Sequence, residues 1–259
     1  MTEKNGDALL KIDGLTKLFG GLAAVQKFNL HVLEGQIQGL IGPNGAGKTT
    51  VFNLASGVLK PTRGQIFFGD HEITRLAPNR IASMGLVRTF QANVLFQDFT
   101  VMENMLLGCH LHTGFGFWRD MLNGPATRRK KAAIQQKADE MVQFVGLENY
   151  RAETAKNLAH GHQRALGVGV ALASDPKLLM LDEPVSGMNL EEKESMMQLI
   201  SRIRDKGITV LVVEHDMKVV MGLCDRIAVL NFGNKIAEGT PQEIQDNPEV
   251  IEAYLGVEQ

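Results

Sequence analysis

The sequence predicts an α/β fold in which helices cover a largely parallel sheet, interrupted by a mainly helical insertion. Short apolar strands alternate with helical segments in both halves of the chain, as is typical of a parallel sheet buried on both faces. Between residues 92 and 157 this alternation stops, and apolar residues recur at helical spacing instead. With 259 residues, the chain is long enough to bury a sizeable core.

Four strands and one helix are expected before the insertion. The strands cover residues 9–12, 28–33, 37–41 and 65–68. In the second of them Phe28, Leu30 and Val32 alternate with polar residues and should point inward. The helix should run from about Lys48 to Ser56, because a glycine follows at the position that often ends a helix.

Within and after the insertion, apolar periodicity defines the remaining elements. In the insertion, helices are expected over 102–109 and 132–145, with a segment rich in glycine and aromatic residues between them. After it, the expected helices cover 163–174, 190–205 and a segment ending at 223, and the expected strands cover 178–181, 209–213 and 227–230.

The charge balance argues against a nucleic-acid partner. Lys plus Arg number 27 and Asp plus Glu number 29, giving a net charge of -2, whereas phosphate-tracking surfaces need clustered positive charge. The basic run at 128–131 is interpreted as a solvated helix face.

The chain also has the features expected of a protein inside the cell. Cys109 and Cys224 show no metal-binding spacing and fit reduced thiols in a cytoplasmic protein. No signal peptide is visible at the polar residues 1–7, and no segment approaches the roughly 20 apolar residues that span a bilayer. Any membrane role should therefore be peripheral.

Residues 42–49 match the phosphate-binding pattern G-x-x-x-x-G-K-[ST], and they lie between an apolar strand and a helix, as that pattern requires. Glycines allow successive backbone amides to turn toward a phosphate at the start of the helix. The expected nucleotide-binding residues are Asn44, Gly45, Ala46, Gly47, Lys48, Thr49 and Thr50. Lys48 would approach the β- and γ-phosphates of ATP, and the Thr49 hydroxyl would bind Mg²⁺.

A pair of carboxylates follows the buried strand at 178–181. Asp182 and Glu183 should lie at the carboxyl edge of the sheet, beside the phosphate loop. Asp182 would hold Mg²⁺, directly or through water, and Glu183 would polarise the water that attacks the γ-phosphate. Such a pair is common at strand ends, and it gains meaning from the phosphate loop in the same chain.

With these motifs, nearly the whole chain resembles the ATP-binding subunits of ABC transporters. The resemblance implies a P-loop NTPase (RecA-like) core, formed by residues 1–91 and 158–259, whose N-terminal part is antiparallel β. It also implies an inserted helical subdomain over 92–157, with the family's signature loop at its end.

Three single residues acquire roles from this resemblance. Gln91 matches the glutamine that touches Mg²⁺ and the attacking water and faces the membrane subunit. His215 matches the histidine that contacts the γ-phosphate after a strand. Phe19 aligns with the aromatic residue that stacks on adenine; the alternative is an ordinary core or turn aromatic.

The signature loop departs from the family's usual Leu-Ser-Gly-Gly-Gln. The matching residues are Leu158, Ala159, His160, Gly161 and His162. In the family this loop approaches the γ-phosphate bound by the other ATPase subunit, so the site requires a dimer. Either His160 and His162 replace the missing donors and make turnover pH-sensitive, or the backbone amides and the helix dipole carry the contact.

Several segments look like one branch of the family, the ATPases of branched-chain amino acid importers. They include residues 19–25, 85–91, 213–221 and 247–256. The long insertion resembles the larger of two paired ATPases, which implies a heterodimer, although a homodimer stays open. Further implied partners are transmembrane permease subunits and, indirectly, an extracytoplasmic substrate-binding protein. The expected location is peripheral, on the cytoplasmic face of the inner or plasma membrane.

Other functions are compatible with the same ATP-hydrolysing motifs. Importers of urea, amides or other amino acids belong to the same branch, and lipid or lipopolysaccharide exporters use similar ATPases. A non-transport ATPase acting on nucleic acid or ribosomes is disfavoured. Such ATPases usually carry two cassettes in one chain or a long coiled-coil insertion, whereas this chain has one cassette and an insertion that is short by comparison.

Overall fold

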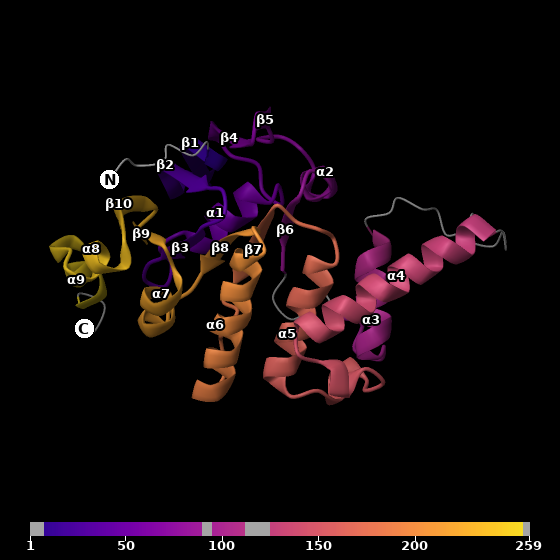
Figure 1. Ribbon diagram of the computed structural model, residues 1–259. Coiled ribbons are helices and arrows are strands. Elements are labelled where there is room, and N and C mark those ends of the chain that lie inside the picture. The colour runs from indigo at the N-terminus through magenta and orange to yellow at the C-terminus, as the bar shows by residue number, and fades with distance from the viewer. Residues whose placement is uncertain (1–7, 90–94, 112–124, 256–259) are drawn as a thin grey trace, which may run out of the picture. The chain divides into compact units, whose positions relative to one another are not determined.

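The computed structural model describes residues 8–89, 95–111 and 125–255. The chain divides into two compact units (Figure 1). The first unit comprises Met1–Arg88, Lys177–Ser186 and Met197–Gln259, and the second comprises Thr89–Pro176 and Gly187–Met196.

The first unit begins with an antiparallel sheet. Its strands are β1 (Ala8–Phe19), β2 (Leu22–Leu33), β4 (Arg63–Phe68) and β5 (His71–Glu72), in the order β2-β1-β4-β5. The first two strands are longer than their apolar runs predict, because Gly20 and Gly21 adopt positive φ and close them into one hairpin. Phe28, Leu30 and Val32 are buried, as predicted.

The second sheet of this unit is parallel except at one edge. Its order is β10-β9-β3-β8-β7-β6, and β10 alone runs antiparallel to its neighbour. The strands are β3 (Ile37–Ile41), β6 (Leu86–Arg88), β7 (Leu178–Asp182), β8 (Thr209–Val213), β9 (Arg226–Asn231) and β10 (Asn234–Gly239). Every residue of β3, β7 and β8 is buried, which confirms the parallel core that continuous apolar runs predict.

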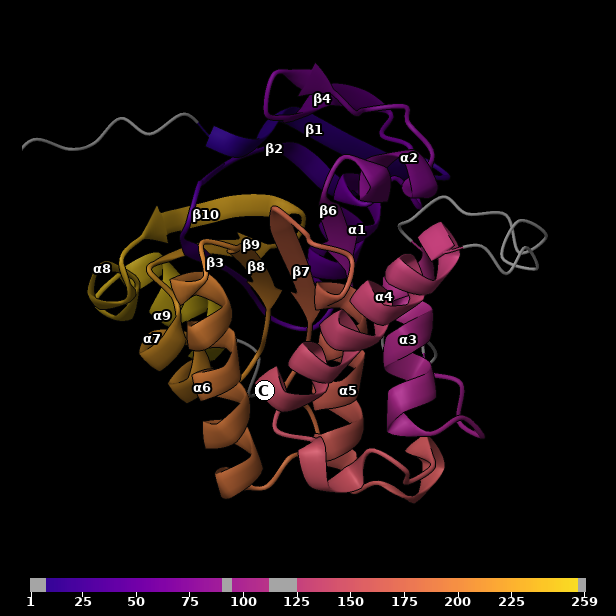
Figure 2. The same ribbon diagram turned by 45° about the vertical axis from the view of Figure 1, so that its right-hand side comes forward.

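Helix α1 (Lys48–Ala55) packs between the two sheets (Figure 2). It ends as predicted, because Gly57 takes a positive φ of 76° two residues after the last helical one. The other helices of this unit are α2 (Pro78–Ser83), α7 (Met217–Leu223), α8 (Pro241–Gln245) and α9 (Pro248–Leu255). Helix α6 (Leu190–Asp205) begins in the second unit and ends in the first.

The second unit is helical and larger than the predicted insertion. It contains α3 (Val101–Leu111), α4 (Pro125–Phe144) and α5 (His160–Leu172), with short 3-10 turns at Glu148–Tyr150 and Ala155–Asn157. The expected boundary at residue 157 differs from this division, because α5 packs closely on α3. A Cβ on Gly108 would lie 2.7 Å from the carbonyl oxygen of Val170. In the part of the chain described, no helix is long and apolar enough to span a membrane.

Candidate active site

The loop that joins β3 to α1 is shaped by glycines. Gly42 and Gly47 have φ of 151° and 107°, in the region that favours glycine. A Cβ on Gly42 would lie 2.1 Å from the carbonyl oxygen of Leu230, and one on Gly47 would lie 2.5 Å from that of Ala24. The loop therefore needs glycine for close backbone approach as well as for conformation.

The start of α1 is suited to an anion. In this fully described turn, the N-cap Gly47 offers no side-chain acceptor and no acidic residue follows it. The first amides of the helix therefore remain free to bind a ligand, and the helix dipole favours negative charge there. Asn44, Gly45 and Thr49 are exposed, whereas Ala46 is buried and Thr50 is half-buried.

Lys48 places a positive charge inside this loop. Its side chain is buried, and its Nζ donates hydrogen bonds to the carbonyl oxygens of Gly42 at 2.6 Å and Pro43 at 3.0 Å. Burial lowers the pKa of Lys48, while the nearby carboxylates of Glu183 and Asp182 act to raise it. The lysine and both carboxylates thus share one electrostatic environment.

The two carboxylates that follow β7 have different surroundings. Asp182 is only 4% exposed, within the sheet edge beside Val213 of β8. Glu183 has a positive φ of 46°, a backbone conformation that is costly for a residue with a Cβ, and its amide donates to the carbonyl oxygen of Val213 at 2.9 Å. The chain thus turns sharply after Asp182.

His215 meets Glu183 at this edge. Its Nδ1 lies 3.7 Å from Oε1 of Glu183, and both side chains are partly accessible. The structure thereby brings together two predicted catalytic side chains that lie far apart in the chain. Pairing of β7 with β8 is the cause, because each residue follows the end of its strand.

Glu214 is a functional candidate that the sequence analysis missed. Its side chain is 1% exposed and accepts hydrogen bonds from the amides of Val185 at 3.0 Å and His215 at 3.2 Å. Burial raises the pKa of Glu214, and those two amides act in the opposite direction. A charged residue directly after an apolar strand was the available signal. Glu214 joins the loop after Glu183 to the loop that carries His215.

Arg88 is a second residue that the sequence analysis missed. It ends β6, and its Nη2 donates to Oδ2 of Asp182 at 2.7 Å. Its Nη1 donates to Oδ1 of Asn53 on α1 at 2.6 Å. An arginine at the end of a short apolar strand was the signal for a charge inside the sheet.

Phe19 in the first unit and Gln91, which follows it at the start of the second, are two further predicted site residues. Phe19 lies at the tip of the β1–β2 hairpin with 48% of its surface exposed, and Nζ of Lys17 lies 5.1 Å from the centre of its ring. This exposure disfavours the alternative of a core aromatic. Gln91 falls outside the described residues.

The signature segment lies in the second unit and forms the beginning of a helix. Helix α5 begins at His160, three residues before the predicted start, with Ala159 as its N-cap. The amide of Gly161 donates to Oε1 of Glu192 at 3.2 Å, and the ring of His162 lies 4.5 Å from that of Tyr150. Leu158, also in this segment, is buried. Gly161 and His162 thus have partners within the unit.

The donors beside the phosphate loop fit a magnesium ion that also binds phosphate. Among the residues the structure describes, no three His, Cys, Asp or Glu side chains gather closely enough to bind a metal. The carboxylate of Asp182 and the hydroxyl of Thr49 are hard oxygen donors of the kind that Mg²⁺ prefers. Because Mg²⁺ commonly takes only one or two protein carboxylates and completes its shell with water and phosphate oxygens, this small set is sufficient.

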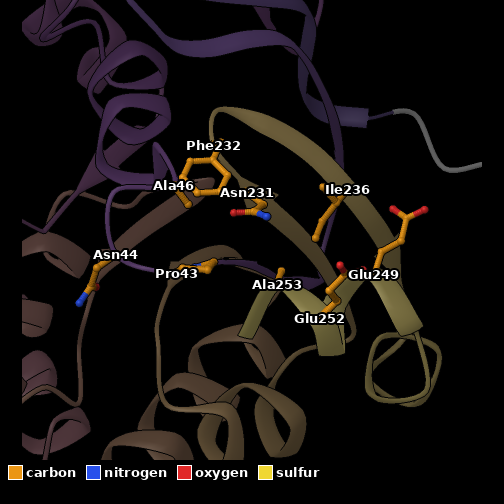
Figure 3. A pocket seen from close by; sticks show the side chains of 9 residues that line it. All are labelled: Pro43, Asn44, Ala46, Asn231, Phe232, Ile236, Glu249, Glu252 and Ala253. Carbon is orange, nitrogen blue, oxygen red and sulfur yellow. The ribbon is translucent and has the colours of Figure 1, made fainter. Parts of the chain in front are cut away.

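A cavity of about 640 Å³ adjoins the phosphate loop (Figure 3). It lies between the loop, the β9–β10 hairpin and α9, and it is lined by Pro43, Asn44, Ala46, Asn231, Phe232, Ile236, Glu249, Glu252 and Ala253. Phe232, at the turn of the hairpin, is 82% exposed. The C-terminal segment therefore borders the phosphate loop directly.

Comparison with protein families gives two matches. Residues 25–186 match the ABC transporter family. Residues 234–259 match the family described as branched-chain amino acid ATP-binding cassette transporter. The second match covers the segment that forms β10, α8 and α9.

Individual proteins resemble the chain over almost its full length. It is 44% identical to the high-affinity branched-chain amino acid transport ATP-binding protein LivG of Escherichia coli strain K12, over 96% of this chain and 98% of the relative. BraF of Pseudomonas aeruginosa, which bears the same description, shows the same identity and coverage. Among solved structures, MJ1267 in its ADP conformation, an ATP-binding cassette of an ABC transporter, has a TM-score of 0.83 at 29% identity, covering 96% of this chain and 99% of MJ1267.

Proposed function

The chain belongs to the ABC transporter family of ATP-binding proteins, and we propose that it hydrolyses Mg-ATP to power the import of branched-chain amino acids. The observation that carries the proposal is the meeting of Glu183 with His215 at the sheet edge, in the electrostatic environment of Lys48.

The phosphate loop and α1 supply the nucleotide site. Backbone amides from Asn44 to Thr50 would bind the phosphates, with Lys48 contributing a positive charge. The hydrogen bonds of Lys48 to carbonyls of its own loop hold the ammonium group at this position. The exposed ring of Phe19 offers a face on which adenine would stack.

Thr49 and Asp182 would hold Mg²⁺, joined by Gln91 in the scheme that the family resemblance implies. A bound Mg²⁺ neutralises the charge that develops on the phosphate oxygens. Asp182 is suited to this task because its carboxylate lies at the carboxyl end of β7, where the strand ends.

Glu183 and His215 would carry out hydrolysis. Glu183 would accept a hydrogen bond from the attacking water and orient it, and His215 would contact the γ-phosphate. The left-handed backbone at Glu183 supports this role, since strained conformations gather at functional sites. Glu214 supports the loop after Glu183 and the loop that carries His215, because it accepts one backbone hydrogen bond from each.

A second ATPase subunit is part of the proposal. The segment from Leu158 to His162 would contact the nucleotide held by that subunit, most directly through backbone amides at the start of α5 other than that of Gly161, which donates to Glu192. Ala159 provides no side-chain acceptor at this N-cap, which supports a contact made by the backbone. The homo- or heterodimer would attach to permease subunits on the cytoplasmic face of the inner or plasma membrane. An extracytoplasmic binding protein would deliver the substrate.

The substrate class rests on the relatives. LivG and BraF are named for branched-chain amino acid transport, and each aligns with 96% of this chain. The C-terminal family match adds a segment specific to this branch.

Uptake of labelled leucine tests the proposal in cells whose only copy of the subunit is wild type, Lys48→Ala or Lys11→Ala. Lys11, which forms an exposed ion pair with Asp13, is the matched control and should leave uptake unchanged. We expect Lys48→Ala to abolish uptake and to weaken ATP binding. Leucine uptake that persists after ATP binding is lost would redirect the search to urea, amides or other amino acids.

A further inference from the structure

Arg88 is a charged side chain inside the first unit. Its side chain is 9% exposed, and its partner Asp182 is 2% exposed at the side chain. The 2.7 Å contact between Nη2 and Oδ2 is a short charge-assisted hydrogen bond between adjacent strands β6 and β7. Asp182 therefore has a fixed cationic partner on the protein.

The other half of the guanidinium group is anchored to helix α1. Nη1 of Arg88 donates to Oδ1 of Asn53 at 2.6 Å and approaches Oγ of Ser56 at 3.4 Å. Its Cζ lies 5.6 Å from the centre of the Phe52 ring, within the range of a cation–π contact. The helix that holds Arg88 is thus the one that begins with Lys48 and Thr49.

A buried ion pair gives little stability by itself, because desolvation of both charges offsets their attraction. The pair has a clearer effect on the geometry of the site than on its stability. The planar guanidinium fork bridges β7 and α1 at once, and a lysine cannot reproduce that bridge. The carboxylate of Asp182 is thereby tied through Arg88 to the helix on which Thr49 lies.

We propose that Arg88 is a positioning residue that orients Asp182 for magnesium binding and ties it to the phosphate-loop helix. The inference rests on the proposed function, because it requires Asp182 to bind Mg²⁺. The outer partners of metal ligands typically act in this way, by fixing the ligand before the ion arrives.

The test measures binding of Mn²⁺, as a probe for Mg²⁺, to the full-length chain with ADP by electron paramagnetic resonance. ADP binding without metal is measured in parallel. Arg88→Lys and Arg88→Met are compared with wild type and with Arg80→Met, which alters an exposed arginine on α2. We expect both Arg88 variants to weaken Mn²⁺ binding by about 10- to 100-fold, while metal-free ADP binding stays near the wild-type value.

Each outcome decides between positioning and a purely structural role. Mn²⁺ affinity equal to wild type in folded Arg88→Lys would overturn the proposal, as would equal losses of ADP binding with and without metal. If Arg88→Met does not fold, Arg88→Lys decides alone. A wild-type chain that binds Mn²⁺ and ADP but supports no leucine uptake in the cell assay would refute the proposed function and leave this inference standing.

Discussion

Oε1 of Glu183 lies 3.7 Å from Nδ1 of His215, across the ends of two adjacent parallel strands. Glu183 reaches this position through a left-handed backbone conformation. The amide of His215 donates to the carboxylate of Glu214, which helps to hold its loop. Their proximity allows both groups to face one ligand beside them, as the water and γ-phosphate of ATP require.

Glu183→Gln should retain ATP binding and lose hydrolysis. The amide keeps the shape of the side chain but is a far weaker base, so we expect turnover to fall by about 10²- to 10⁴-fold. Steady-state phosphate release and retention of labelled ATP would measure the two effects. Glu72→Gln, on exposed β5, is the matched control. Wild-type turnover in Glu183→Gln would exclude this residue as the base.

Glu214 should make stability depend on pH. Because burial raises its pKa, the folded chain holds this proton more tightly than the unfolded chain does. Its contribution to stability is therefore complete below the ordinary pKa of 4.5 and is lost as pH rises through the raised value. Urea unfolding near pH 4 and pH 7 would show a smaller decline for Glu214→Gln than for wild type. An equal decline in both proteins would contradict the assignment.

The two cysteines should be inert in the folded chain. Burial raises the pKa of the Cys224 thiol to about 12 and raises that of Cys109 as well, so neither forms the reactive thiolate near neutral pH. Iodoacetamide at about pH 8 should label neither cysteine in native protein and both in urea. Mass spectrometry of the two peptides would measure this, and rapid labelling of native Cys224 would contradict its burial.

Two helical glycines of the second unit should respond oppositely to alanine. Gly167 on α5 has open space where a Cβ would stand, so Gly167→Ala should stabilise the helix by up to about 1 kcal/mol. At Gly108 on α3 a Cβ would lie 2.7 Å from the Val170 carbonyl oxygen, and Gly108→Ala should destabilise by about 1–3 kcal/mol. Thermal unfolding of both variants measures the contrast, which would disappear if α3 and α5 did not pack closely.

Local sequence was sufficient for the two central strands of the parallel sheet, β3 and β8, and for the phosphate loop. The strand at 37–41 and the strand at 209–213 have the predicted bounds, because continuous apolar runs and the turns that flank them define both ends. Strand β10 and the three-residue β6 escaped prediction. The residues of β10 are mostly polar and half-buried, and β6 is too short to show a period.

The sequence by itself determined the chemistry of this protein: a glycine-rich loop with Lys48, a carboxylate pair after one buried strand, and a histidine after the next buried strand. These features depend on residue types over a few neighbouring positions, which a sequence displays directly. Only the tertiary structure decided the partners of those groups, including the bond from Arg88 to Asp182 and the support that Glu214 gives to His215. The physical reason is that strand pairing and helix packing set these distances, joining residues that are up to 94 positions apart in the chain.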